Sequence, residues 1–134
     1  MAGNSEEQLL LAMLAHVSWV AILYVVLTIV RAPGVWGIGR LPDGTNPWAQ
    51  IEPRVSANLR NQFEWPILFY VVCILALIGQ STSERILVLL AWIFLAGRIA
   101  HSGVQFLTSN VRLRGVVFTI NFLAVLCMWV LLFV

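Results

Sequence analysis

The stretch RVSANLRNQFEWPILFYVVCILAL, residues 54–77, begins as a polar helix and ends as an apolar run that is able to enter a membrane. Arg60, Asn61 and Glu64 stand directly before that run. The apolar part, up to the next glycine, spans only about 22 Å as a helix, whereas a hydrocarbon core is about 30 Å thick. We therefore predict one continuous helix over residues 59–79, with the three polar side chains at or just below headgroup depth.

The composition places the rest of the chain in a membrane as well. Of its 134 residues, 60% are hydrophobic and only 10% are charged, far outside the range of soluble domains. Further apolar runs predict spans at residues 9–30, 86–106 and 116–134. Residues 31–53, rich in proline and glycine, predict an interfacial loop. The fold class is thus an all-α membrane protein, a bundle of four transmembrane helices in a single domain, residues 1–134.

The arginines predict how the bundle is oriented. They flank the first loop and the short third connection, whereas the N-terminus and the second loop carry little positive charge. The positive-inside rule places the first and third loops in the cytoplasm and both termini outside. We expect an integral protein of a bacterial inner membrane. Neither cysteine has a metal-ligand pattern around it, so we predict no metal site.

The third span carries polar residues within its apolar run. Arg98, His101 and Gln105 lie at i, i+3 and i+7, and so share one helix face. Arg98 lies about 12 Å below the membrane surface, where an arginine that faces lipid costs several kcal/mol. We expect it to face the bundle interior and to be paired, with Glu64 as the candidate partner. His16, in the first span, has no evident polar partner at helical spacing, and we assign it no role.

The cytoplasmic ends of the helices collect far more cations than carboxylates. This excess indicates an anion, either a lipid phosphate or a small anionic ligand that also offers an amine to Glu64. The alternative is ordinary positive-inside topology with contacts to lipid headgroups. It explains Arg31, Arg112 and Arg114, but not Arg98, Asn61 and Glu64, which we expect to be buried. The cluster comprises Arg31, Arg54, Arg60, Asn61, Glu64, Arg98, His101, Gln105, Arg112 and Arg114.

Two short motifs in this order resemble the MAPEG family, membrane-associated proteins in eicosanoid and glutathione metabolism. They are N-x-x-E at Asn61 and Glu64, and G-R-x-x-H from Gly97 to His101, followed by the basic turn VRLRG. The resemblance covers nearly the whole chain. It implies a homotrimer of four-helix subunits that bind glutathione between neighbours, near the cytoplasmic side.

The resemblance also implies roles for single residues. It implies glutathione contacts at Arg31, Arg54, Arg60, Asn61, Glu64, Arg98, His101 and Gln105. Arg114 occupies the place of the arginine that is thought to stabilise the thiolate, and is the candidate catalytic residue. Four positions depart from the family pattern. Ala57 replaces a basic residue, Gln105 a tyrosine, and Gly115 the serine of the prostaglandin-forming branch, and Pro66 follows Glu64 earlier than in the eicosanoid enzymes.

These observations predict a membrane glutathione transferase or peroxidase. Its partners would be a lipophilic small-molecule substrate, glutathione as co-substrate, membrane lipid and two further copies of the chain, with no nucleic acid. The alternative is a non-catalytic protein of the same fold that binds lipid or acts as a scaffold, which Ala57 and Gln105 favour. A small proton-coupled multidrug exporter fits less well, because residues 9–30 contain no acidic residue.

Overall fold

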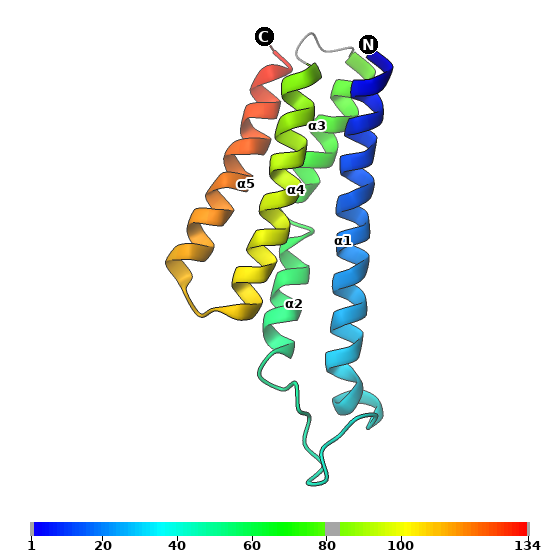
Figure 1. Cartoon of the computed structure of the whole chain (residues 1–134), viewed down its shortest axis with the longest axis vertical. Coiled ribbons are helices and arrows are strands. Elements are labelled where there is room, and N and C mark those ends of the chain that lie inside the picture. Colours follow the sequence, from blue (N-terminus) through cyan, green and yellow to red (C-terminus); the bar gives the residue numbers. More distant parts are fainter. Residues whose placement is uncertain (1, 80–83, 134) are drawn as a thin grey trace.

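The described part of the chain is helical wherever it has regular structure. The computed structural model describes residues 2–79 and 84–133, and its helices run side by side along one axis (Figure 1). The predicted connection at residues 80–83 and the last residue lie outside this part. The helices are α1 (Ala2–Trp36), α2 (Glu52–Asn61), α3 (Pro66–Gly79), α4 (Glu84–Leu107) and α5 (Val111–Leu131).

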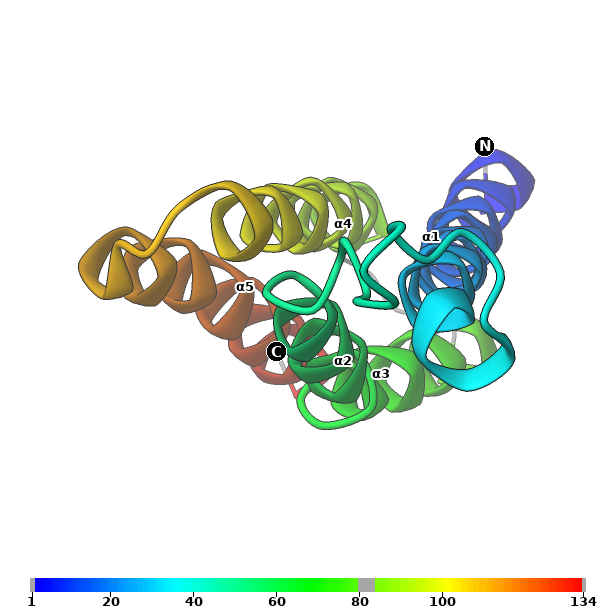
Figure 2. The ribbon, with the colours of Figure 1, turned by 90° about the horizontal axis from the view of Figure 1, so that it is seen from below.

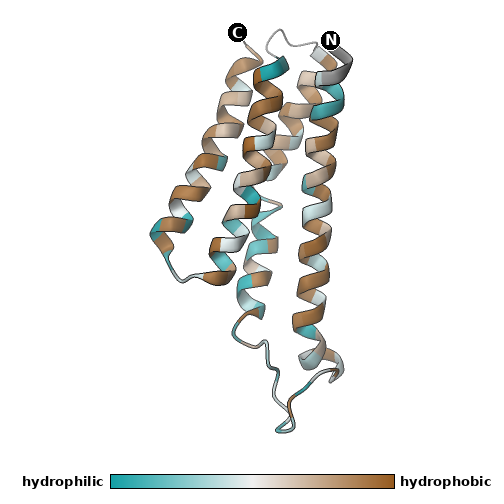
Figure 3. Cartoon of the chain, viewed as in Figure 1, coloured by the Kyte–Doolittle hydropathy of each residue, from teal (hydrophilic) through white to brown (hydrophobic). Residues whose placement is uncertain are grey.

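Four stretches are long and apolar enough to cross a membrane within the described residues. Many large apolar side chains are exposed on the outside of the bundle, and the helices of Figure 3 are brown, the colour of hydrophobic residues, over much of their length. An all-α membrane fold with four spanning helices is therefore confirmed. The spans are Ser5–Trp36, Glu52–Gly79, Glu84–Leu107 and Val111–Leu131, so α2 and α3 together form the second.

The loop that joins α1 to α2 and the turn that joins α4 to α5 lie at one end of the bundle, and both chain ends lie at the other (Figure 1). Seen along the bundle, α5 diverges from α2 towards the α4–α5 turn (Figure 2). Which end faces the cytoplasm stays a prediction.

The prediction of one continuous second helix is wrong. α2 ends at Asn61, residues 62–65 form turns, and α3 begins at Pro66. Proline has no amide hydrogen and its ring disfavours helix just before it, whereas the first position of a new helix accommodates it well. The backbone amides of Gln62 and Phe63 instead close the end of α2 through short bonds to the carbonyls three residues back, at 3.0 Å each.

The predicted loop at residues 31–53 is shorter in the structure, because α1 continues to Trp36 through Pro33. Loop side chains bind the carbonyls of its last turns. Arg40 Nε donates to the carbonyl oxygen of Pro33 at 2.7 Å, and Asn46 Nδ2 donates to that of Val30 at 3.1 Å. These bonds satisfy helix-end carbonyls that would otherwise lack a partner.

The predicted basic turn VRLRG is also helical. Asn110 stands at the N-cap of α5, and its Oδ1 accepts a hydrogen bond of 3.0 Å from the backbone amide of Leu113. Asparagine is among the best N-cap residues because its oxygen satisfies such an amide. As a result Arg112 and Arg114 lie in the first turns of α5, beside its positive helix end.

The interior changes character along the bundle. Towards the chain ends it is apolar, with Phe69 stacked on Phe94 at 4.1 Å between ring centroids, and with Leu87 and Met128 fully buried. Towards the loop end a second apolar cluster between α1 and α2 lies beside a group of buried polar side chains, and α2 carries several of the hydrophilic segments in Figure 3. This polar interior supports the candidate site.

Candidate functional site

Arg98 is completely buried and is held by the broken second span. Its Nε donates to Gln62 Oε1 at 3.1 Å, and its Nη2 donates to the carbonyl oxygen of Asn61 at 2.8 Å. That carbonyl ends α2 and has no amide partner four residues on, because the helix stops there. A cation at a helix C-terminus also interacts favourably with the helix dipole. Arg98 therefore caps α2 from a neighbouring helix.

The expected ion pair between Arg98 and Glu64 is not formed. Glu64 is exposed, and the one salt bridge among the described residues joins Arg31 to Glu52 at 2.7 Å. The break after Asn61 explains the difference, because it brings a free carbonyl and the Gln62 carboxamide to the guanidinium. The expectation that Arg98 faces the interior is correct.

Sequence reasoning missed the inward face of α2. Asn58 and Gln62, one turn apart, point into the bundle, whereas the predicted residues Arg60 and Glu64 point out. Gln62 Nε2 donates to Asn58 Oδ1 at 3.3 Å, and Asn58 Nδ2 donates to Gln105 Oε1 at 2.9 Å. The sequence does contain this amide pair at i and i+4, but the N-x-x-E motif predicts the other face of the helix.

His16 belongs to the same polar interior. Its Nδ1 lies 2.7 Å from Tyr70 Oη, and its Nε2 lies 3.2 Å from Gln62 Oε1. Both partners are far along the chain, so no spacing rule pointed to them. His16 thus links α1 to α3 and to the break between α2 and α3.

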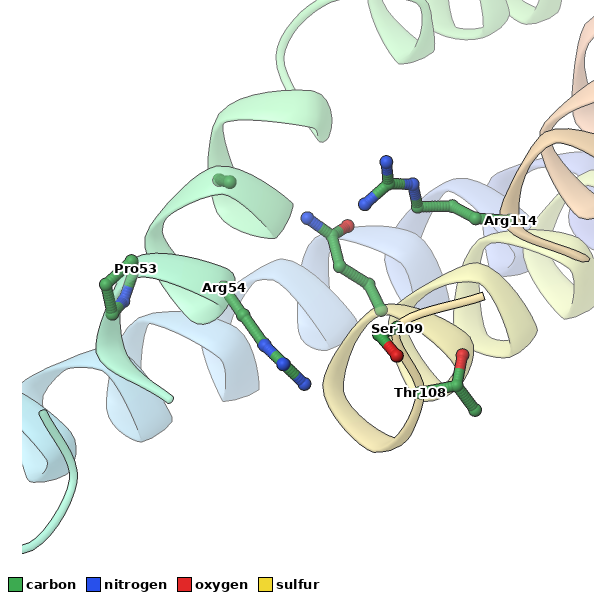
Figure 4. Close-up of a pocket in the computed structure, with 7 residues that line it drawn as sticks. Pro53, Arg54, Thr108, Ser109 and Arg114 are labelled. Carbon is green, nitrogen blue, oxygen red and sulfur yellow. The ribbon is translucent and has the colours of Figure 1, made fainter. Parts of the chain in front are cut away.

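A cavity of about 320 Å³ opens at the loop end, between α2, α4 and the start of α5. Arg54 of α2 and Arg114 of α5 extend from opposite sides towards its middle (Figure 4). Arg54 Nη1 also reaches the carbonyl oxygen of Phe106 near the end of α4, at 3.5 Å. The lining residues are Pro53, Arg54, Ala57, Gln105, Thr108, Ser109 and Arg114.

The lining gives the cavity a positive character that suits an anion. It contains two guanidinium groups, an amide and two hydroxyls, and no acidic residue is among the lining residues. The N-terminus of α5 adds positive potential at the same place. Among the described residues no cluster of His, Cys, Asp or Glu is able to hold a metal ion.

The family comparison agrees with this architecture. The MAPEG family model matches residues 9–134, which is nearly the whole chain. The chain belongs to the MAPEG family. Neither the curated proteins nor the solved structures that were searched include a match. Membership supports a function in glutathione-related or eicosanoid metabolism at the membrane, and MAPEG proteins commonly use glutathione.

Within one MAPEG subunit the site residues implied by the resemblance divide into three groups. Arg54, Gln105 and Arg114 line the cavity together. Arg98 and His101 are buried behind it, and neither ring nitrogen of His101 has a partner in the described part of the chain. The members away from the cavity are Arg60 and Glu64, both exposed, Asn61, partly buried, and Arg31, paired with Glu52.

Proposed function

We propose that this MAPEG protein binds glutathione in the Arg54–Arg114 cavity and transfers its thiolate to lipophilic electrophiles, as a glutathione transferase or peroxidase. The observation that supports this most directly is the meeting of two guanidiniums with Gln105 in a cavity whose lining residues include no acid. Glutathione carries two carboxylates and one ammonium, so it is a net anion that such a lining attracts.

Arg114 is the proposed catalytic residue. A free thiol has a pKa near 8.5, so only a few per cent is thiolate at neutral pH. A guanidinium that lowers this pKa by about two units stabilises the thiolate by about 2.7 kcal/mol. The thiolate sulfur then adds to an electrophilic carbon while the neighbouring carbon takes up a proton, or it displaces a leaving group from that carbon. In the peroxidase reaction, two glutathiones reduce a lipid hydroperoxide to the alcohol and water and leave as the disulfide. The protein contributes position and charge stabilisation.

A homotrimer completes the proposed site. Arg60, Asn61 and Glu64 face away from the cavity of their own subunit, and Glu64 is available for the glutathione amine. We propose that this outer face meets the cavity of a neighbouring subunit, in a bacterial inner membrane with the site towards the cytoplasm. Arg98 and His101 support the site from behind. Arg31 contributes to carboxylate binding once it exchanges Glu52 for the ligand.

Arg114→Ala tests the catalytic role. Glutathione bound to the wild type should show the ultraviolet absorbance of a thiolate, and the variant should bind glutathione without that signal. Arg112→Ala is the matched control, because Arg112 lies on the same helix turn and does not line the cavity. Persistence of the signal in Arg114→Ala would remove this role from Arg114.

The second candidate function is a lipid-binding or scaffold protein without catalysis. Ala57 lines the cavity at the position where the resemblance places a basic residue, so the cavity has one cation fewer. Titration calorimetry with millimolar glutathione separates the two candidates. Specific heat of binding supports the enzyme, and its absence supports the scaffold.

A further inference from the structure

A relay of hydrogen bonds connects buried Arg98 to the wall of the cavity. Arg98 Nε donates to Gln62 Oε1 at 3.1 Å, and Gln62 Nε2 donates to Asn58 Oδ1 at 3.3 Å. Asn58 Nδ2 then donates to Gln105 Oε1 at 2.9 Å, and Gln105 lines the cavity. Three carboxamides thus follow one another from the centre of the bundle to the site.

The donor and acceptor atoms determine which way each carboxamide of this relay is turned. A guanidinium has only donors, so the atom that Gln62 turns to Arg98 must be its oxygen. The nitrogen of Gln62 therefore faces Asn58, which must answer with its own oxygen, and the same step repeats at Gln105. Gln105 Nε2 remains at the far end. Gln105 lines the cavity, and its side chain also lies near that of His101, one turn earlier on α4.

The surrounding groups agree with this direction. Gln62 Oε1 also faces His16 Nε2, so that nitrogen carries the proton and Nδ1 accepts from the Tyr70 hydroxyl. The Ser102 hydroxyl lies 2.9 Å from Asn58 Oδ1, where it meets an acceptor. Each amide in the relay is more than nine-tenths buried, so water does not compete for these bonds.

We propose that Arg98, acting through Gln62 and Asn58, fixes the Gln105 carboxamide with its NH₂ group towards the cavity. Gln62 and Asn58 are then positioning residues, and Gln105 is a specificity determinant. Gln105, Arg54 and Arg114 then all present hydrogen-bond donors to the ligand, and this set of donors selects a carboxylate. The identification of glutathione as that carboxylate ligand rests on the function proposed above.

Gln62→Glu reverses the relay by changing one atom. The new carboxylate lies against the Arg98 guanidinium, which keeps it ionised, and its second oxygen accepts only. Asn58 must then turn its NH₂ group to the new glutamate and its oxygen to Gln105. Gln105 in turn donates to that oxygen and presents its own oxygen to the cavity. Nitrogen-15 NMR in detergent micelles measures this directly, with the Gln105 side-chain signal assigned by its loss in Gln105→Met.

In the wild type the Gln105 amide protons should exchange rapidly with water, and in Gln62→Glu they should become protected. Glutathione binding should weaken at least about tenfold, the value of one lost charge-assisted hydrogen bond. In a Gln105→Met background the same change should leave the affinity nearly unaltered. Ser102→Ala is the matched control, because it removes a neighbour of Asn58 without changing the direction of the relay.

Protected Gln105 protons in the wild type, or unchanged exchange in Gln62→Glu, would overturn the relay. If Gln62→Glu does not fold, Asn58→Leu replaces it, because it releases Gln105 and should shift the exchange rate of its amide; an unchanged rate would again overturn the proposal. A wild type that binds no glutathione refutes the proposed function, whereas the exchange measurement still decides the relay.

Discussion

Replacing Arg98 by lysine tests how a buried cation is held in this membrane bundle. Arg98 donates to two acceptors on different groups, Gln62 Oε1 and the Asn61 carbonyl, at 3.1 and 2.8 Å. Lysine keeps the charge, but its compact ammonium lacks the planar fork that serves both acceptors together. We expect Arg98→Lys to lose about one charge-assisted hydrogen bond, which corresponds to about 1.5–3 kcal/mol of stability.

Arg98→Met makes the prediction sharper. Methionine loses both hydrogen bonds, about 3–6 kcal/mol in total, but it also removes a buried charge whose desolvation costs several kcal/mol. These effects largely cancel, so we expect Arg98→Met to be no less stable than Arg98→Lys. If charge pairing held the cation instead, removal of its partner Glu64 would cost about 3–5 kcal/mol. Because Glu64 is exposed and unpaired with Arg98, we expect Glu64→Gln to stay within about 0.5 kcal/mol.

Unfolding in mixed micelles of a mild detergent and sodium dodecyl sulfate measures all three variants. The 6 tryptophans of the chain give the fluorescence signal. Arg98 is not held in this way if Glu64→Gln is destabilised as much as Arg98→Lys, or if Arg98→Lys is as stable as the wild type. Either result would mean that the capped end of α2 is not what holds Arg98.

Two further predictions concern helix packing and capping, and the same unfolding assay measures both. A Cβ at Gly97 would overlap the Asn121 carboxamide, so Gly97→Ala should lower the free energy of unfolding by about 1–3 kcal/mol. Adding Asn121→Ala should restore much of this loss, because that carboxamide has no partner among the described residues. A Gly97→Ala protein with wild-type stability would contradict the close packing of α4 on α5. Asn110→Ala removes the N-cap of α5 and should cost about 1 kcal/mol; no loss would show that the cap bond to Leu113 contributes nothing.

Hydropathy was sufficient to predict the number of spans, because a membrane demands about 20 apolar residues per helix regardless of their partners. The depth of Arg98 likewise required that it face inwards, since lipid does not solvate a cation. The helix ends were harder. α1 continues past Pro33 because loop residues bind its last carbonyls, and those contacts form only when the loop folds back.

The register of the second span shows where sequence reasoning stops. Asn61 and Glu64 on one face, and Asn58 and Gln62 on another, are equally plausible inward faces by spacing alone. The choice depends on three-dimensional partners: Arg98 and Gln105 come from α4, and His16 comes from α1. The family motif does not resolve it either, because in the proposed trimer the N-x-x-E motif would serve a neighbouring subunit and so face outwards in its own.

The way Arg98 is held has a consequence for the site. A carboxylate partner would have cancelled its charge, whereas a carbonyl and a carboxamide bind the guanidinium and leave the positive charge in place. In a low-dielectric interior that charge acts over a longer range than it does in water. The cavity, three carboxamides away, therefore receives the field of Arg98 as well as that of its own two arginines. Under the proposed function, a neutral partner for the buried cation favours the binding of an anion in the cavity.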